Sequence, residues 1–142
     1  MRLHIVTIGK PKLVYALAGF NEYIKRLGRM HDVRTTHIPN KHNDAEHILK
    51  AAADAHLVTL VINGPQKTSK ELAQFLRKRE LEAMEVCFII GGPDGLPKEV
   101  IDKSETKIGL SKLTFPHDLA MVVLAETLYR SSTINAGHPY HH

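Results

Sequence analysis

"VCFIIGGPDGLP", Val86–Pro97, joins an apolar run to a glycine-rich turn. Four of the five residues in Val86–Ile90 are aliphatic or aromatic, as in a strand that is buried on both faces of a sheet. Gly91, Gly92 and Gly95 follow almost at once, although one glycine is enough for a turn. This excess of glycine indicates backbone that passes close to another chain segment or to a ligand.

Strand and helix patterns alternate on both sides of this stretch. Apolar and β-branched runs predict strands at Leu3–Ile8, Val33–Ile38, His56–Ile62, Val86–Ile90 and Thr106–Ser111. Helical spacing of apolar residues predicts helices at 13–27, 43–55, 69–83, a short one from Pro97, and 117–133. Such alternation is typical of a mostly parallel sheet with helices on both faces, so the sequence predicts an α/β fold in a single domain, residues 1–142.

Residues with known capping preferences mark several helix ends. Asn43 with Glu46, and Thr68 with Glu71, have the spacing of capping boxes, and Gly28 is placed to end the first helix. The buried face of that first helix is predicted to consist of Leu13, Leu17, Phe20, Ile24 and Leu27.

The composition is that of one compact soluble domain: 142 residues, 43% hydrophobic and 24% charged. No apolar run approaches the roughly 20 residues needed to span a bilayer, and the first residues lack a signal-peptide pattern. The single cysteine, Cys87, lies in a predicted buried strand and has no partner for an internal disulfide. We therefore interpret Cys87 as a core residue and expect a cytoplasmic protein.

The net charge of +4 permits a polyanionic partner such as nucleic acid, although many basic proteins bind none. Two basic runs, Lys67–Lys70 and Arg77–Arg79, have a spacing that suits contacts with RNA phosphates. The same runs are equally consistent with a solvated helix face.

Three loops follow predicted strands in the second half of the chain: "NGPQKTS" after Ile62, "GGPDGL" after Ile90 and "SKLTFPH" after Leu110. Ligands of open parallel sheets gather at the carboxyl ends of the strands, so these loops form one pocket wall if their strands are neighbours. The glycine loop matches neither the Walker A pattern nor the dinucleotide fingerprint. By itself it is equally consistent with a tight turn that caps a helix.

The last quarter of the chain places polar residues on or beside an otherwise apolar helix: His117, Glu126, Arg130, Tyr140, His141 and His142. Glu126 and Arg130 are four residues apart, so they share a helix face and can pair, either as a structural salt bridge or within a site. His138 and His141 are three apart, but no carboxylate or cysteine cluster accompanies them. No metal site is predicted, and no G-x-S-x-G motif indicates a serine hydrolase.

Four of these stretches together resemble the RlmH/YbeA family: "IGGPDGL" (90–96), "LSKLTFPH" (110–117), "LAETLYR" (124–130) and "HPYHH" (138–142). The opening "MRLHIVTIGK" and "GFNEYIKRL" (19–27) are similar to its first strand and helix, so the resemblance covers essentially the whole chain. It implies a SPOUT-class enzyme that transfers a methyl group from S-adenosylmethionine to N3 of a pseudouridine in 23S ribosomal RNA on the assembled ribosome. It also implies a C-terminal trefoil knot and a homodimer with its active sites at the interface.

The resemblance assigns residues by motif. The cofactor contacts implied are Leu60, Gly92, Ser111, Lys112, Leu113, Thr114, Phe115 and Pro116. The catalytic residues implied are His141 as a base, Tyr140 and Arg130 as groups that bind or polarise the nucleotide, and Glu126 as the residue that orients Arg130.

Two positions depart from the family pattern. Met121 stands where members usually carry arginine, and His142 stands where they usually carry arginine or lysine. We interpret both as lost cations on the RNA side of the site, since histidine is cationic only when protonated. Two alternatives therefore stay open: a protein that binds cofactor and ribosome without catalysis, and an α/β nucleotide-binding regulator without an RNA partner.

Overall fold

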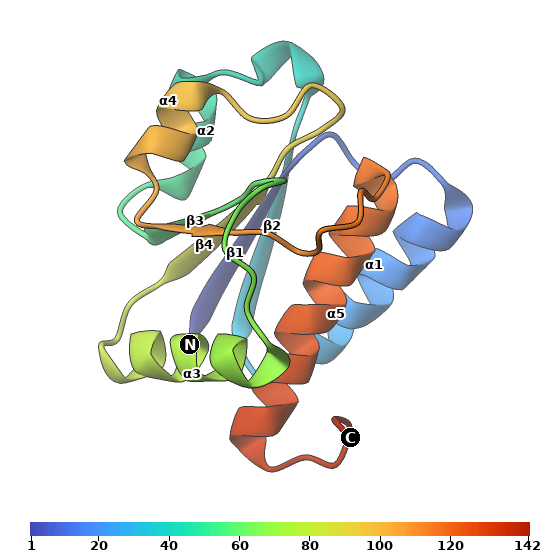
Figure 1. The fold of residues 1–142 in the computed structure, drawn as a ribbon, viewed down its shortest axis with the longest axis vertical. Coiled ribbons are helices and arrows are strands. Elements are labelled where there is room, and N and C mark those ends of the chain that lie inside the picture. Colours follow the sequence, from blue (N-terminus) through green and yellow to red (C-terminus); the bar gives the residue numbers. More distant parts are fainter.

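The structure is a computed structural model that describes residues 1–142 (Figure 1). Its strands are β1 (Arg2–Ile8), β2 (Asp32–Ile38), β3 (His56–Leu60), β4 (Val86–Ile90) and β5 (Thr106–Ile108). Its helices are α1 (Val14–Leu27), the 3₁₀ turn η1 (Asn40–His42), α2 (Ala45–Ala52), α3 (Ser69–Leu81), α4 (Lys98–Lys103) and α5 (His117–Ala136). None of these helices has the length and apolar character needed to cross a membrane.

The five strands form one sheet in the order β2-β1-β4-β3-β5, and every pair is parallel. Helices α2 and α4 cover one face, while α1, α3 and α5 cover the other (Figure 1). This confirms the predicted α/β architecture. Because all strands run in the same direction, the loops after β3, β4 and β5 leave the sheet at the same edge.

β4 lies in the middle of the sheet and is buried along its whole length. Its side chains alternate: Phe88 and Ile90 pack into the core under α1, α3 and α5, whereas Cys87 and Ile89 pack under α2 and α4. Burial raises the pKa of the Cys87 thiol to about 12, so this cysteine is an inert core residue, as the sequence indicates.

The predicted helix caps agree with the structure for α3 but not for α2. Thr68 caps α3 by accepting the backbone N–H of Glu71, as predicted. α2, however, is capped by Asp44, which accepts the N–H of His47, and the predicted cap Asn43 instead donates its side-chain amide to Gly95 O at 3.0 Å. Asn43 cannot serve as the cap because it closes the preceding 3₁₀ turn.

Two boundaries and one core residue also differ from the prediction. α2 ends at Ala52 because Ala53 takes a positive φ of 50° that no helix continues. β3 ends at Leu60, leaving Ile62 80% exposed. Leu13 is 53% exposed because it is the cap residue of α1 and lies outside the buried helix face.

β5 is shorter than predicted because Gly109 leaves the strand to contact another loop. Gly109 N donates to Pro65 O, and Val61 N donates to Ile108 O. A side-chain carbon on Gly109 would lie 2.5 Å from the Gly64 carbonyl oxygen, and one on Gly64 would lie 2.7 Å from Gly109 N. Two backbones therefore cross in direct contact here, and only glycine fits at either position.

Four histidines are packed against hydroxyl groups in the fold. His4, His31 and His56 contact Thr36, Ser132 and Thr106 at 2.7, 2.9 and 2.8 Å, and His37 contacts Thr7. Burial is the main cause that lowers the pKa of each of these imidazoles below its usual value of 6.5. The folded protein therefore binds fewer protons than the unfolded chain just below that pH.

A lowered histidine pKa predicts acid sensitivity at mild pH. The free energy of unfolding should be constant above about pH 7 and fall as pH decreases from 6.5, by up to about 1.4 kcal/mol per pH unit for each histidine that titrates fully. Urea unfolding between pH 5.5 and 8 measures this, above the range in which most carboxylates titrate. A flat profile in the wild type contradicts the prediction.

Candidate functional site

A pocket of about 400 Å³ lies at the carboxyl edge of the sheet, between the loops that follow β3, β4 and β5. Two of the three predicted loops, those after β4 and β5, therefore meet at one pocket, whereas the third side is formed by Leu60–Ile62, just before "NGPQKTS". The pocket includes all the cofactor residues that the resemblance implies except Lys112, namely Leu60, Gly92, Ser111, Leu113, Thr114, Phe115 and Pro116. Its lining is mainly apolar, and its volume is within the roughly 300–1,000 Å³ typical of small-molecule sites.

The glycine loop after β4 forms one side of this pocket. Contacts and backbone angles within the chain explain why each of its glycines is glycine. A side-chain carbon on Gly91 would lie 2.8 Å from the Gly95 backbone, and one on Gly92 would lie 3.2 Å from Ile8 O at the end of β1. Gly95 has a φ of +73° and donates its N–H to Gly92 O. The glycines thus let the loop fold tightly on itself and on β1, so that its backbone faces the pocket.

The opposite side of the pocket is the segment between β5 and α5. Ser111 Oγ accepts the backbone N–H of Leu113 at 3.0 Å, which bends the segment. Leu113 remains 74% exposed although it lines the pocket, so a large apolar side chain lies at the mouth without cover from its own chain. An apolar group placed here gains contact with Leu113 without displacing protein atoms.

Buried Asp118 ties the first turn of α5 to the segment before α1. Its Oδ2 accepts the backbone N–H groups of Lys12 and Leu13 at 2.8 and 2.7 Å, and its Oδ1 lies 3.2 Å from His117 Nε2. The sequence gives no signal for Asp118 because the contact joins residues far apart in the chain. It fixes the apolar residues Leu13–Tyr15 beside the pocket, where His117 is part of the lining.

The four residues that the resemblance assigns to catalysis lie together at the other end of α5. Arg130 contacts Glu126 Oε1 through Nε at 2.9 Å and Nη2 at 2.7 Å, and Tyr140 donates its hydroxyl to the same oxygen at 3.2 Å. The tail folds back so that the Tyr140 ring lies under the Arg130 guanidinium, 4.9 Å away. Glu126 therefore contacts both Arg130 and Tyr140, and its role in orienting Arg130 stays a prediction.

Interactions within the cluster affect the protonation of its side chains. The hydrogen bond to Glu126 raises the pKa of Arg130, and burial raises the pKa of Tyr140, so Tyr140 stays a neutral phenol. Arg130 Nη1 lies 3.1 Å from His141 Nδ1. Because arginine can only donate, Nδ1 must accept, which places the proton of a neutral His141 ring on Nε2.

Tyr23 of α1 is part of this cluster, and the sequence analysis did not single it out. Its hydroxyl lies 3.3 Å from that of Tyr140, and its ring is stacked under the Arg26 guanidinium. The resemblance in residues 19–27 covered this residue without giving it a role. Only the folded tail brings Tyr23 and Tyr140 together.

The pocket and the catalytic cluster lie apart in one chain. α5 begins beside the pocket at His117 and carries Arg130 thirteen residues later, which corresponds to about 20 Å along a helix. Figure 1 shows the C-terminus beside the far end of α5, away from the loops at the carboxyl edge of the sheet. One subunit therefore holds both groups of residues without bringing them into contact.

The two departures from the family pattern differ in position. His142 is exposed in the tail, where a cation can contact RNA. Met121 is 0% exposed and packs in the core under α1 and α5. The interpretation of Met121 as a lost RNA contact is therefore wrong for this chain, because a fully buried side chain cannot reach a phosphate.

Two of the four basic residues of α3, Arg77 and Arg79, form ion pairs with nearby glutamates. Arg77 contacts Glu80 at 2.9 Å, and Arg79 contacts Glu82 at 3.6 Å while lying over the Phe75 ring. The exposed pair of Arg77 is typical of a solvated helix face, which favours that alternative for Arg77, whereas the Arg79 side chain is only 16% exposed and Lys78 forms no ion pair. Lys67 and Lys70 are exposed near the start of α3 and stay candidates for phosphate contacts.

Comparison with known proteins gives full-length matches. The family model described as "Predicted SPOUT methyltransferase" matches residues 1–141. The protein named ribosomal RNA large subunit methyltransferase H from Deinococcus deserti is 46% identical over 144 residues, with 99% of each chain covered. A protein of the same name from Exiguobacterium sibiricum is 35% identical over 158 residues, again with 99% of each chain covered.

Solved structures share the fold at low sequence identity. The probable methyltransferase from Bordetella pertussis aligns with a TM-score of 0.62 at 14% identity, covering 92% of this chain and 93% of that chain. TrmJ from Z. mobilis aligns with a TM-score of 0.61 at 14% identity, covering 91% of this chain and 68% of that chain. At this identity the likeness concerns the fold alone.

Proposed function

The chain belongs to the SPOUT methyltransferase family, and from that premise we propose that it methylates N3 of a pseudouridine in 23S ribosomal RNA on the assembled ribosome. The observation that carries the proposal is the full-length similarity, at 46% and 35% identity, to proteins named ribosomal RNA large subunit methyltransferase H. An enzyme with this substrate works where ribosomes assemble, in the cytoplasm.

The pocket fits the adenosine part of S-adenosylmethionine. Its apolar walls include Leu60, Leu113 and Phe115, and the folded glycine loop leaves no side chain on the side of Gly91 and Gly92. Planar aromatic groups are held by such apolar walls, and exposed backbone N–H and C=O groups can read the polar edge of a base. When bound, S-adenosylmethionine supplies a methyl group that its sulfonium makes electrophilic.

The protein must then prepare the nucleotide. N3 of a uracil-like ring becomes a good nucleophile only when its proton leaves, and the resulting anion needs a cation beside it. Arg130 provides that fixed cation, and neutral Tyr140 provides a hydrogen-bond donor. His141 accepts the N3 proton once Arg130 releases Nδ1 to contact the nucleotide; until then Nε2–H can only donate.

The separation of the two groups supports a homodimer whose active site is shared. A tail that lies about 20 Å from its own pocket can serve the pocket of a partner subunit. Leu13, Val14 and Tyr15 are exposed beside the pocket, and Val14 is 87% exposed. An apolar patch at that place is suited to a second copy of the chain, which would also cover Leu113.

A C-terminal knot is part of the same proposal. The contact of Gly64 with Gly109 presses the loop after β3 against the end of β5, and the chain then continues through 111–116 into α5. A chain that passes through such a crossing brings three loops together around one ligand. The pocket lining supports this arrangement.

The direct test is methyl transfer from labelled S-adenosylmethionine to intact ribosomes that lack the modification, followed by mass spectrometry of the nucleosides. Label in N3-methylpseudouridine supports the proposal. Retention on ribosomes with intact cofactor binding but no label would instead favour a protein that binds without catalysis. Cofactor binding without any ribosome retention would favour a nucleotide-binding regulator.

Mixed dimers test the shared site. Leu113→Asp should weaken cofactor binding by placing a charge in the apolar wall of the pocket, and Arg130→Ala should disable the tail, so each homodimer is expected to be inactive. A heterodimer of the two, co-expressed and purified through two different tags, retains one intact site if pocket and tail come from different subunits, and should show about half of wild-type activity. An inactive heterodimer of the correct mass contradicts the shared site.

A further inference from the structure

A second group of polar side chains lies outside both parts of the proposed active site. His42 ends the 3₁₀ turn η1, Asp44 caps α2, and His47 lies in the first turn of α2. In the sequence, only His138 and His141 stand out as a histidine pair, and "HNDAEH" (42–47) has no established metal-binding pattern. Its signal is a His-x-Asp-x-x-His spacing, which becomes a cluster only because the chain turns sharply before α2.

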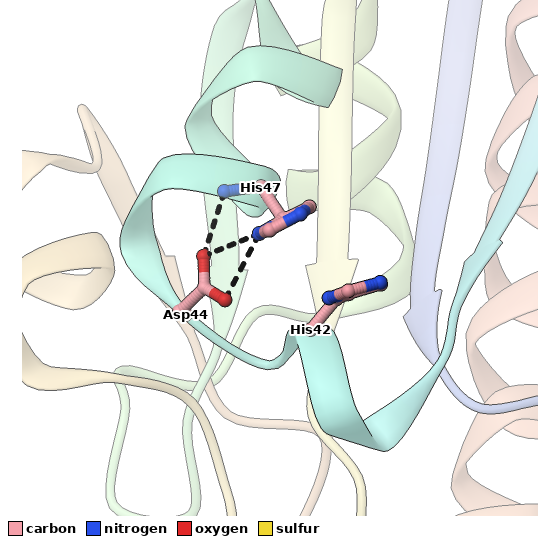
Figure 2. Close-up of side chains that lie close together, drawn as sticks. All are labelled: His42, Asp44 and His47. Atoms are coloured by element: carbon pink, nitrogen blue, oxygen red, sulfur yellow. Dashed lines mark hydrogen bonds and ion pairs between the residues drawn. The ribbon is translucent and has the colours of Figure 1, made fainter.

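The three side chains converge on one another (Figure 2). Each offers a ligand atom, and these atoms all lie within 4.8 Å of one another. His47 Nδ1 lies 2.8 and 2.9 Å from the two carboxylate oxygens of Asp44. The imidazoles of His42 and His47 are stacked, with ring centres 4.1 Å apart and planes inclined by only 14°.

We propose that His42, Asp44 and His47 bind a divalent transition-metal ion of the Zn²⁺ type. Two imidazoles and one carboxylate form a donor set that binds Zn²⁺ in preference to hard ions such as Mg²⁺. The ion takes the place of the hydrogen that His47 shares with Asp44, and that proton passes to the solvent. Water completes the coordination.

The backbone around the cluster is held in place. Asp44 Oδ1 accepts the N–H of His47, which fixes the carboxylate at the start of α2. The positive end of the α2 dipole disfavours a cation at this place, but the ionised carboxylate of Asp44 in the same turn offsets this effect. To bring three such atoms to metal–ligand distances of about 2 Å, the two imidazoles must rotate out of their stacked arrangement, which the partial exposure of the cluster permits.

The residue between two of the ligands gives independent support. Asn43 Oδ1 is buried without a hydrogen-bond partner in the chain, so an ordered water or an ion must satisfy it. The other end of the same amide donates to Gly95 O in the glycine loop. An ordered ion at His42 and Asp44 would therefore also hold Asn43 in its contact with the pocket loop.

Zinc titration of the full chain tests the site, after removal of metal with a chelator. Because the chain has ten histidines, two variants are compared: His42→Ala/His47→Ala, and His138→Ala/His141→Ala/His142→Ala. Calorimetry should show one Zn²⁺ site in the wild type and the tail variant, weakened at least about tenfold in the cluster variant. Mg²⁺ should not compete.

Asp44 is left in place so that α2 keeps its cap, and both variants should unfold at the wild-type temperature without metal. Three results overturn the proposal: a cluster variant that binds Zn²⁺ as tightly as the wild type, a loss that follows the tail variant instead, or a wild type that takes up no Zn²⁺ at millimolar concentration. A weak, unsaturable uptake by all variants alike would indicate surface histidines only.

Discussion

Replacing Arg130 by alanine is expected to lower kcat for methyl transfer by about 10²- to 10³-fold, while the affinity for S-adenosylhomocysteine stays unchanged. Arg130 is the only cation in hydrogen-bond contact with Glu126, and it also contacts His141. Without it the anion of the target base loses its fixed counter-charge, and His141 loses the contact that orients it. Arg130 is not among the residues that line the pocket, and its proposed contact in the shared site is with the nucleotide, so cofactor binding is spared.

Single-turnover rates on ribosomes and calorimetry with S-adenosylhomocysteine measure the two quantities separately. Arg77→Ala removes an arginine that also pairs with a glutamate of its own helix, Glu80, and should change the rate less than about threefold. Arg130→Lys keeps the charge but loses the two-pronged contact with Glu126, so it should recover only part of the rate. A rate within threefold of wild type for Arg130→Ala would remove this residue from the mechanism.

Introducing arginine at position 121 is expected to destabilise the protein by about 3–5 kcal/mol, because it places an unpaired charge in the core. Met121 is fully buried among apolar residues of α1 and α5, and arginine keeps its charge there. Met121→Leu, which conserves volume and polarity, should cost less than about 1.5 kcal/mol. Urea unfolding monitored by circular dichroism gives both values.

The burial of Met121 leaves His142 as the position at which the effect of a missing cation on RNA binding can be tested. His142→Arg changes an exposed residue, so it isolates the effect of a cation on RNA without affecting the core. A gain in rate for His142→Arg would indicate a weakened RNA contact in the natural chain. Should Met121→Arg prove as stable as the wild type, α5 must present that position to solvent, contrary to the packing described above.

The sequence predicted the parts of the fold that depend on local pattern. Val86–Ile90 is a buried strand within the predicted bounds, and Thr68 caps α3 as expected. The cap of α2 was misplaced because Asn43 and Asp44 are adjacent and both prefer such positions. Only the preceding turn, which uses Asn43, selects between them.

What could not be predicted depends on contacts between distant residues. The burial of Met121 depends on how α5 packs against α1, and the contact of Tyr23 with Tyr140 depends on the path of the tail. The separation of pocket and tail along α5 likewise appears only in the folded chain. A motif names residues of a site without saying which copy of the chain supplies them.

The crossing of Gly64 and Gly109 has a consequence for the order in which the protein forms. These residues are far apart in the sequence, and their contact tolerates no side chain, so neither loop can take its final path until the other is in place. Contacts of this kind delay folding. A chain still emerging during translation therefore has no completed cofactor pocket, and the enzyme becomes competent only after nearly its whole length is available.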